Sequence, residues 1–124
     1  MLAHLIFAMG VGRILLGLAP FVAATSASNL MGFPREHDNP TSVLMARFFG
    51  VRDIGLGVLV FYGLKHPETL AFLLLFNALT DFGDLFAIAI PLARRQGIDR
   101  AAWTSAGFAL PAGLAWLAVL SRVP

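Results

Sequence analysis

The chain has 124 residues, of which 58% are hydrophobic and 13% are charged, and its formal net charge is +2. Soluble domains average about 45–50% apolar and about 25% charged residues, so this composition excludes a large soluble enzyme and a disordered tail. The absence of cysteine excludes thiol–disulfide exchange, iron–sulfur clusters and thiolate zinc sites. The arginines are scattered through apolar segments and form no basic stripe, so we expect no nucleic acid partner.

Four long apolar segments follow one another along the chain. They cover residues 2–24, 41–64, 68–93 and 100–121. Each exceeds the roughly 20 residues that a helix needs to cross a bilayer, and helices satisfy their own backbone groups inside lipid. The sequence therefore predicts one all-α domain over residues 1–124, an integral membrane four-helix bundle with antiparallel up-down topology. The lipid bilayer is its first expected partner.

Polar connections separate the predicted helices. Residues 25–40 predict a polar loop with room for a short surface helix, residues 65–67 a tight turn, and residues 94–99 a third connection. Lysine and arginine are more frequent around the first and third connections than on the side with the termini. We therefore expect loops 25–40 and 94–99 in the cytoplasm and both termini outside the cell membrane. Residues 2–24 lack the basic start of a signal peptide, so we expect no cleavage.

Six ionisable side chains lie well inside the apolar segments. They are Arg13, Arg47, Arg52, Asp53, Asp81 and Asp84. Each costs about 2.5–3.5 kcal/mol at the centre of a membrane helix when it is left unpaired. Three are cationic and three anionic, so the sequence predicts that they form ion pairs.

The register of neighbouring helices indicates which charges pair. Residues 41–64 and 68–93 are joined by a tight turn and should be antiparallel neighbours, which matches Arg52 with Asp81 and Arg47 with Asp84 in depth. Asn77 shares the face of Asp81 and Asp84 through i, i+4, i+7 spacing.

A second pattern predicts the remaining pair. Arg13 and Asp53 are each flanked by glycines at i−3 and i+4. Glycines let helices approach closely inside membranes, and both charges fall near the middle of their segments. We therefore expect Arg13 to pair with Asp53.

Ionisable groups inside a membrane indicate a ligand or proton site. The sequence thus predicts a pocket for a small lipophilic or amphipathic molecule. Its candidate binding residues are Arg13, Arg47, Arg52, Asp53, Asn77, Asp81 and Asp84. If the protein is an enzyme, Asp81 or Asp84 is the candidate catalytic proton acceptor. Two alternatives stay open: a small oligomeric transporter, and a structural or partner-binding subunit whose ion pairs only fix helix packing.

Cofactors and oligomerisation leave weaker signals. No cofactor and no metal site is evident, since His4 and His66 without further ligand spacing are poor indicators of a metal. Small residues form a stripe along the last predicted helix, at Ala102, Ala106, Ala109 and Gly113. Such a stripe suits packing within the bundle or a homo-oligomer contact.

One run of residues carries a family resemblance. Residues 47–57 read R-F-F-G-V-R-D-I-G-L-G, which fits the pattern R-x-F-G-x-R-D-x-x-L-G. With Arg13 before it and two aspartates in the third segment, this run resembles a domain-of-unknown-function family of small four-helix bacterial and fungal membrane proteins. The resemblance implies a four-helix membrane bundle and no particular activity. In architecture the chain is also similar to DoxX-like and anthrone-oxygenase-like membrane proteins, a similarity that implies fold alone.

Overall fold

Five α-helices and one 3-10 turn make up the computed structural model, which describes residues 1–124 and contains no strand. The helices are α1 (Leu2–Val22), α2 (Ala24–Met31), α3 (Pro40–Lys65), α4 (Pro67–Ala93) and α5 (Asp99–Leu120), and the 3-10 turn is Arg35–His37. The expected all-helical class is confirmed. The four-helix description is incomplete, because the first polar connection contains the additional short helix α2.

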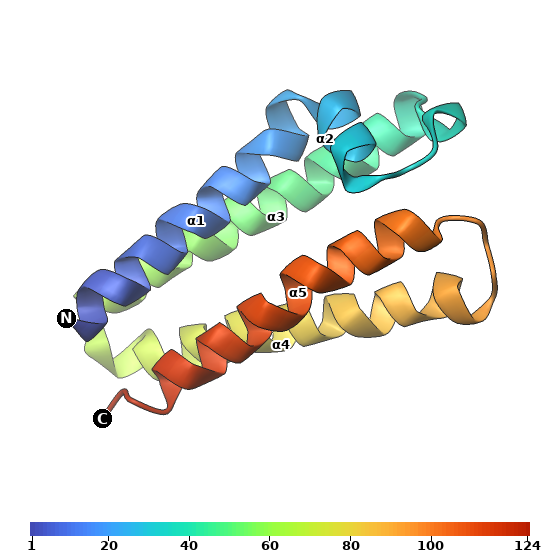
Figure 1. Ribbon diagram of the computed structural model, residues 1–124. Coiled ribbons are helices and arrows are strands. Elements are labelled where there is room, and N and C mark those ends of the chain that lie inside the picture. Colours follow the sequence, from blue (N-terminus) through green and yellow to red (C-terminus); the bar gives the residue numbers. More distant parts are fainter.

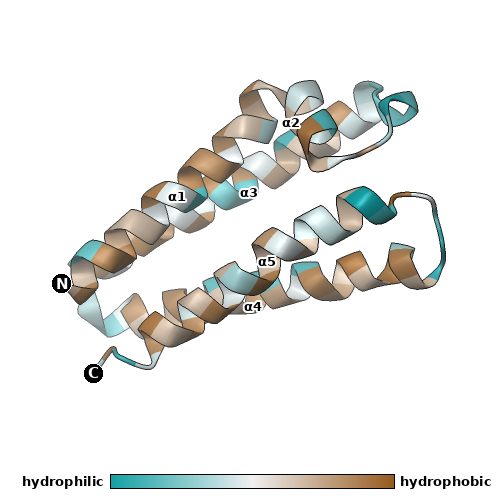
Figure 2. Cartoon of the chain, in the orientation of Figure 1, coloured by the Kyte–Doolittle hydropathy of each residue, from teal (hydrophilic) through white to brown (hydrophobic).

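Three helices are long and apolar enough to cross a membrane: α1, α4 and α5. Helix α3 is as long, but every stretch of it that could span a bilayer contains at least three charged residues, among them Arg52 and Asp53. Large apolar side chains such as Phe72 and Phe86 lie exposed on the outside, and Figure 2 shows apolar residues along all the long helices. So much exposed apolar surface requires a lipid environment. The protein is therefore embedded in a membrane.

Local sequence explains where α3 and α4 begin. Asn39 caps α3: its side-chain oxygen accepts a hydrogen bond from the backbone N–H of Ser42 at 2.9 Å, and its own N–H donates to Ser42 Oγ at 3.0 Å. Pro40 and Pro67 occupy the first position of α3 and α4, where a missing N–H costs nothing. Only His66 separates the two helices, so α4 turns back immediately after α3.

The long helices form two pairs, α1 with α3 and α4 with α5 (Figure 1). Glycines allow the closeness of the first pair: a Cβ atom added at Gly17 would lie 2.6 Å from the carbonyl oxygen of Gly50, and one at Gly57 would lie 2.8 Å from that of Gly10. The expected role of these glycines is confirmed. The backbones of α1 and α3 therefore approach each other closely at these glycines.

A small apolar core joins the two pairs at the end that carries the chain termini (Figure 1). All four long helices contribute to it. Its buried members are Ile6, Val60, Leu74, Ala78, Trp116 and Val119. Beyond this core, the facing sides of the two pairs do not pack against each other. They line a cleft instead.

Candidate functional site

Two arginines and three aspartates form one continuous network. Arg13 Nη1 donates to Asp81 Oδ2 at 2.8 Å, and Arg13 Nη2 donates to Asp53 Oδ1 at 3.5 Å. Arg52 donates to the same oxygen of Asp53 at 3.3 Å. Both terminal nitrogens of Arg52 also reach Asp84, one to each carboxylate oxygen, at 2.8 Å. The order is Asp81–Arg13–Asp53–Arg52–Asp84, with the charges alternating in sign.

The network ties the first helix pair to the second. Arg13 comes from α1, Arg52 and Asp53 from α3, and Asp81 and Asp84 from α4. Arg52 and Asp53 are neighbours on one helix and point about 100° apart. Asp53 therefore faces α1, and Arg52 faces α4. Every ion pair except the one between Arg52 and Asp53 therefore crosses between helices.

Burial divides the network into an inner and an outer part. The side chains of Arg13, Asp53 and Asp81 are 6%, 8% and 7% exposed. Those of Arg52 and Asp84 are 36% and 26% exposed. The inner part is thus enclosed, where unpaired charges are expensive, and the outer part remains accessible.

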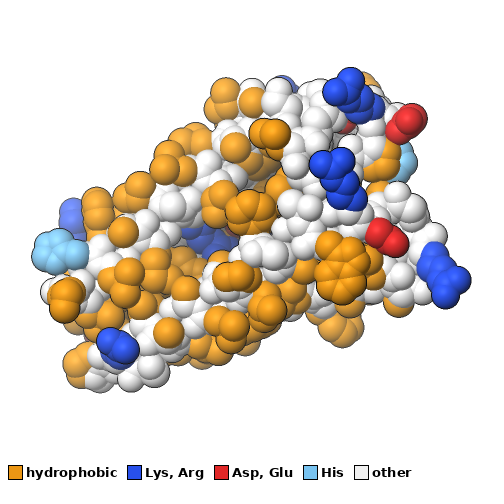
Figure 3. Space-filling model, in the orientation of Figure 1, with side chains coloured by type: hydrophobic (Ala, Val, Ile, Leu, Met, Phe, Trp, Pro, Cys, Tyr) orange, Lys and Arg blue, Asp and Glu red, His pale blue; other side chains and the backbone are white.

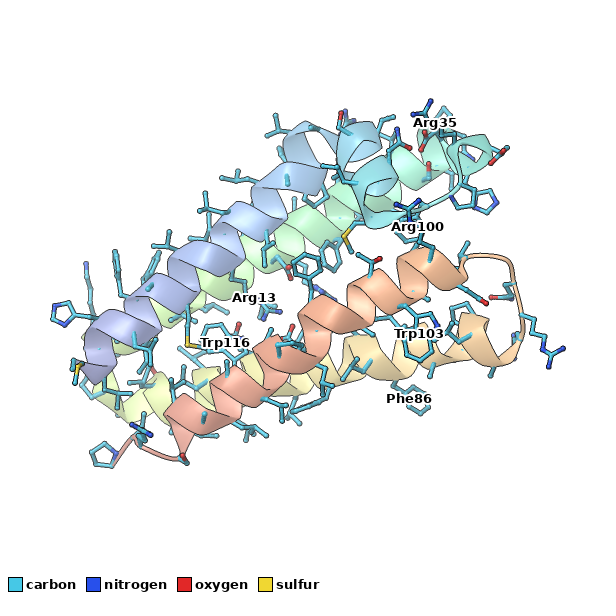
Figure 4. All side chains as sticks on the ribbon, viewed as in Figure 1. Arg13, Arg35, Phe86, Arg100, Trp103 and Trp116 are labelled. Atoms are coloured by element: carbon cyan, nitrogen blue, oxygen red, sulfur yellow. The ribbon has the colours of Figure 1, made fainter.

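Aromatic rings accompany both arginines. The guanidinium carbon of Arg13 lies 6.0 Å from the centre of the Trp116 ring, and that of Arg52 lies 4.5 Å from the centre of the Phe49 ring. Figure 4 shows Arg13 and Trp116 between α1 and α5. Both distances lie within the range of cation–π attraction.

The predicted pairings are only partly correct. Arg13 does pair with Asp53, as the mirrored glycines indicate. The expected pair of Arg52 with Asp81 is wrong, because Asp81 is held by Arg13 and Arg52 holds Asp84 instead. Matching α3 with α4 by depth ignored α1, whose arginine reaches across to α4.

Two predicted members lie outside the network. The expected pair of Arg47 with Asp84 is wrong: Arg47 is exposed on α3 and forms no ion pair, since both oxygens of Asp84 are taken by Arg52. Asn77 is buried one turn before Asp81, and its side-chain nitrogen donates to the Leu73 carbonyl at 3.0 Å. Its side-chain oxygen has no hydrogen-bond partner.

A cleft of about 1320 Å³ lies between the two helix pairs, and Arg13, Asp53, Asp81 and Asp84 line it. Its walls are mostly apolar and come from α1, α3, α4 and α5, while α2 and the segments 33–38 and 96–98 surround its outer end. In the space-filling view, arginine or lysine atoms are visible in a hollow between the pairs (Figure 3). A polar group inside an apolar cleft can orient the polar end of a lipophilic molecule.

The family model for a domain of unknown function, DUF4267, matches residues 10–120. The chain belongs to this family. The matched range contains all five members of the network, so the network lies within the part of the chain that carries the DUF4267 pattern. Searches of curated proteins and of solved structures found no match.

The sequence reasoning missed one site residue of this DUF4267 protein, Trp116. Trp116 is not among the expected binding residues, yet it is 2% exposed and lines the cleft, whereas Trp103 is 67% exposed. The spacing along α5 indicates that Trp116 is buried, because it follows the small residues Ala102 and Ala109 at seven-residue intervals. Both of these residues are buried inside the molecule.

No three histidine, aspartate or glutamate side chains lie together in an arrangement that could hold a metal ion. The three aspartates of the network are instead engaged by guanidinium groups. This arrangement is chemically suited to binding, because it places charged hydrogen-bond donors and acceptors at one end of an apolar space.

Proposed function

We propose that the cleft binds a small lipophilic or amphipathic molecule, with its polar end on the Arg–Asp network and its apolar body against the cleft walls. The observation that carries the proposal is the position of the network at the wall of a cleft of about 1320 Å³. The side chain of Asp84 is 26% exposed and lines the cleft, so part of the network is open to that space.

The composition of the cleft supports the same function. Ligand pockets combine apolar walls with a few polar groups, as this cleft does, although its volume of about 1320 Å³ is above their usual range of about 300–1,000 Å³. If the bound molecule is also transformed, Asp81 is the better candidate for a proton acceptor, because one of its oxygens accepts no hydrogen bond while Asp84 is held through both. Transport of the molecule and a purely structural role are the competing functions.

The membrane arrangement that goes with this function has four crossings. The long helices α1, α3, α4 and α5 run in alternating directions, and α3 crosses with its charges turned toward α1 and α4 instead of toward lipid. The outer end of the cleft then lies on the side of the membrane where α2 is located. A ligand reaches the network from that face, past residues such as Phe33, His37 and Ile98.

Gly12 offers a direct test, because it lines the cleft and a Cβ atom added there would meet nothing within 4 Å. We expect Gly12→Leu to fill part of the cleft without disturbing the fold. The protein would be purified from membranes in wild-type and variant form, and the co-purifying small molecules identified by mass spectrometry. The wild type should carry a molecule that Gly12→Leu has lost.

The matched control is Gly107→Leu. Gly107 is exposed on α5, does not line the cleft, and also has open space around an added Cβ atom. It should retain the molecule at the wild-type level. Equal retention by Gly12→Leu, or no co-purifying molecule in any of the three proteins, would contradict the proposal.

A further inference from the structure

The charges that line the cleft are predominantly negative. Four aspartates line it, Asp38, Asp53, Asp81 and Asp84, against a single arginine, Arg13. Within the network, each of the three aspartates contacts an arginine, but three carboxylates share only two guanidinium groups, so the network carries one negative charge in excess. An unbalanced charge in a membrane interior is costly, and a bound cation would remove that cost.

Two carboxylate oxygens in the network are free to accept a hydrogen bond. Asp81 accepts only through Oδ2 and Asp53 only through Oδ1, which leaves Asp81 Oδ1 and Asp53 Oδ2 without a donor. Neither of these two oxygens is sealed inside the protein. Both side chains are more than nine-tenths buried, and both line the cleft. The network therefore offers two carboxylate oxygens without a donor, both on residues that line the cleft.

The aromatic side chains of the cleft fit the same kind of ligand. Trp116, Phe49 and Phe108 line it, and the Trp116 ring lies beside the inner part of the network. Aromatic faces attract organic cations as well as arginine. Carboxylates and aromatic rings together form the usual environment of a bound ammonium group.

From these observations we infer that the ligand of the cleft is a lipophilic amine in its protonated form. This inference rests on the proposed function, and it adds the chemical class of the ligand. The ammonium group donates to Asp81 Oδ1 and Asp53 Oδ2 and balances the third carboxylate charge, while the apolar body lies along the cleft walls. The competing class is an anion, for which the unpartnered Nε donor of Arg13 would be the receptor.

Trp116 can report on binding directly. The chain has two tryptophans, so Trp103→Phe leaves Trp116 as the only one, and Trp103 is exposed and does not line the cleft. This protein would be placed in phosphatidylcholine nanodiscs at pH 7 and titrated with hexylamine, 1-hexanol and hexanoate while Trp116 fluorescence is recorded. Hexylamine should half-saturate at a concentration about tenfold below hexanol, the gain expected from one charge-assisted hydrogen bond. Hexanoate should bind more weakly than either.

Variants then assign the preference to the network. Asp81→Asn should reduce the preference for amine over alcohol about tenfold, and Asp53→Asn provides an independent second substitution. The matched control is Glu68→Gln, which removes a negative charge from the exposed start of α4. Its preference should equal that of the parent. Adding Gly12→Leu to the parent should abolish the Trp116 response to all three compounds.

The outcomes separate the ligand class from the proposed function. Hexanol or hexanoate binding as tightly as hexylamine overturns the cationic class, as does an amine response that survives Gly12→Leu or no response to any compound. The comparison of the three compounds in the Trp103→Phe parent needs no folded aspartate variant. Whether the cleft holds a molecule at all is decided separately, by the co-purification experiment with Gly12→Leu and Gly107→Leu.

Discussion

Arg13 is the residue on which most of the ion pairing depends. It contacts Asp53 on α3 and Asp81 on α4 from a third helix, and its side chain is 6% exposed. Asp81 has no other cationic partner, whereas Asp53 also contacts Arg52. The loss of Arg13 therefore leaves one buried carboxylate wholly uncompensated.

This arrangement predicts a specific pattern in a double-mutant cycle. Arg13→Met should lower the free energy of unfolding by about 3–5 kcal/mol, the usual cost of breaking a buried pair by removing one partner. Arg13→Met with Asp81→Leu should cost clearly less, because both charges leave together. Unfolding in mixed detergent, followed by circular dichroism, measures the wild type, Arg13→Met, Asp81→Leu and the double variant.

Arg47→Met is the control for this cycle, since Arg47 is exposed and has no ion-pair partner. It should change the free energy of unfolding by less than about 0.5 kcal/mol. A double variant as unstable as Arg13→Met alone would mean that the pair is not the source of the loss.

The sequence identified all five members of the network, but it also included Arg47 and gave only the pair of Arg13 with Asp53 correctly. A charge inside an apolar segment stands out whatever the fold, which is why Arg13, Arg52 and Asp53 were recognisable. Which charges pair depends on how α1, α3 and α4 cross. The depth of residues along α3 and α4 alone does not reveal this crossing. Trp116 was missed for the same reason: the face of α5 that meets the cleft is defined only once the helix pairs are placed.

At the level of helices, the contact between α1 and α3 depends on glycine. A Cβ atom on Gly17 would fall 2.6 Å from the Gly50 carbonyl oxygen and 2.9 Å from the Ile54 nitrogen, both of them backbone atoms that cannot move aside alone. We expect Gly17→Ala to separate the two helices and to lower the free energy of unfolding by about 1–3 kcal/mol, the range for overpacking. Thermal unfolding in detergent measures the change.

Gly55→Ala serves as the comparison on α3, because an added Cβ atom there meets nothing within 4 Å. Alanine is a better helix former than glycine by about 1 kcal/mol in helix interiors, so this variant should be neutral or more stable. Equal destabilisation by Gly17→Ala and Gly55→Ala would show that the close approach is not what the glycines provide.

The helical segments were predictable because apolar length and capping residues are local properties. Asn39 and Pro40 mark the start of α3, and Pro67 marks that of α4, through interactions within one turn. The angle between the two helix pairs is a property of the whole molecule. For that reason the sequence could predict a pocket lined by the charges, but not the distinction between two helix pairs and a closed bundle.

At the scale of the molecule, the two ends differ in charge. The end with α2 and the outer part of the cleft carries Arg35, Arg94, Arg95 and Arg100, while the end with the termini carries Lys65 and Arg122. Basic residues in short loops favour the cytoplasmic side. This difference predicts that the cleft opens toward the cytoplasm and that both termini lie outside.

Single cysteines can test this orientation, because the chain contains none of its own. Gln96→Cys places a thiol at the outer end of the cleft, and Ser121→Cys places one just after α5; both positions are exposed. A membrane-impermeant maleimide should label Ser121→Cys in intact cells and Gln96→Cys only after permeabilisation, while the cysteine-free parent stays unlabelled. Reversed labelling would contradict the orientation alone, since the helices would still cross in alternating directions. Labelling of both thiols from one side would contradict the crossing of α5 itself, and with it the entry of a ligand from the face of α2.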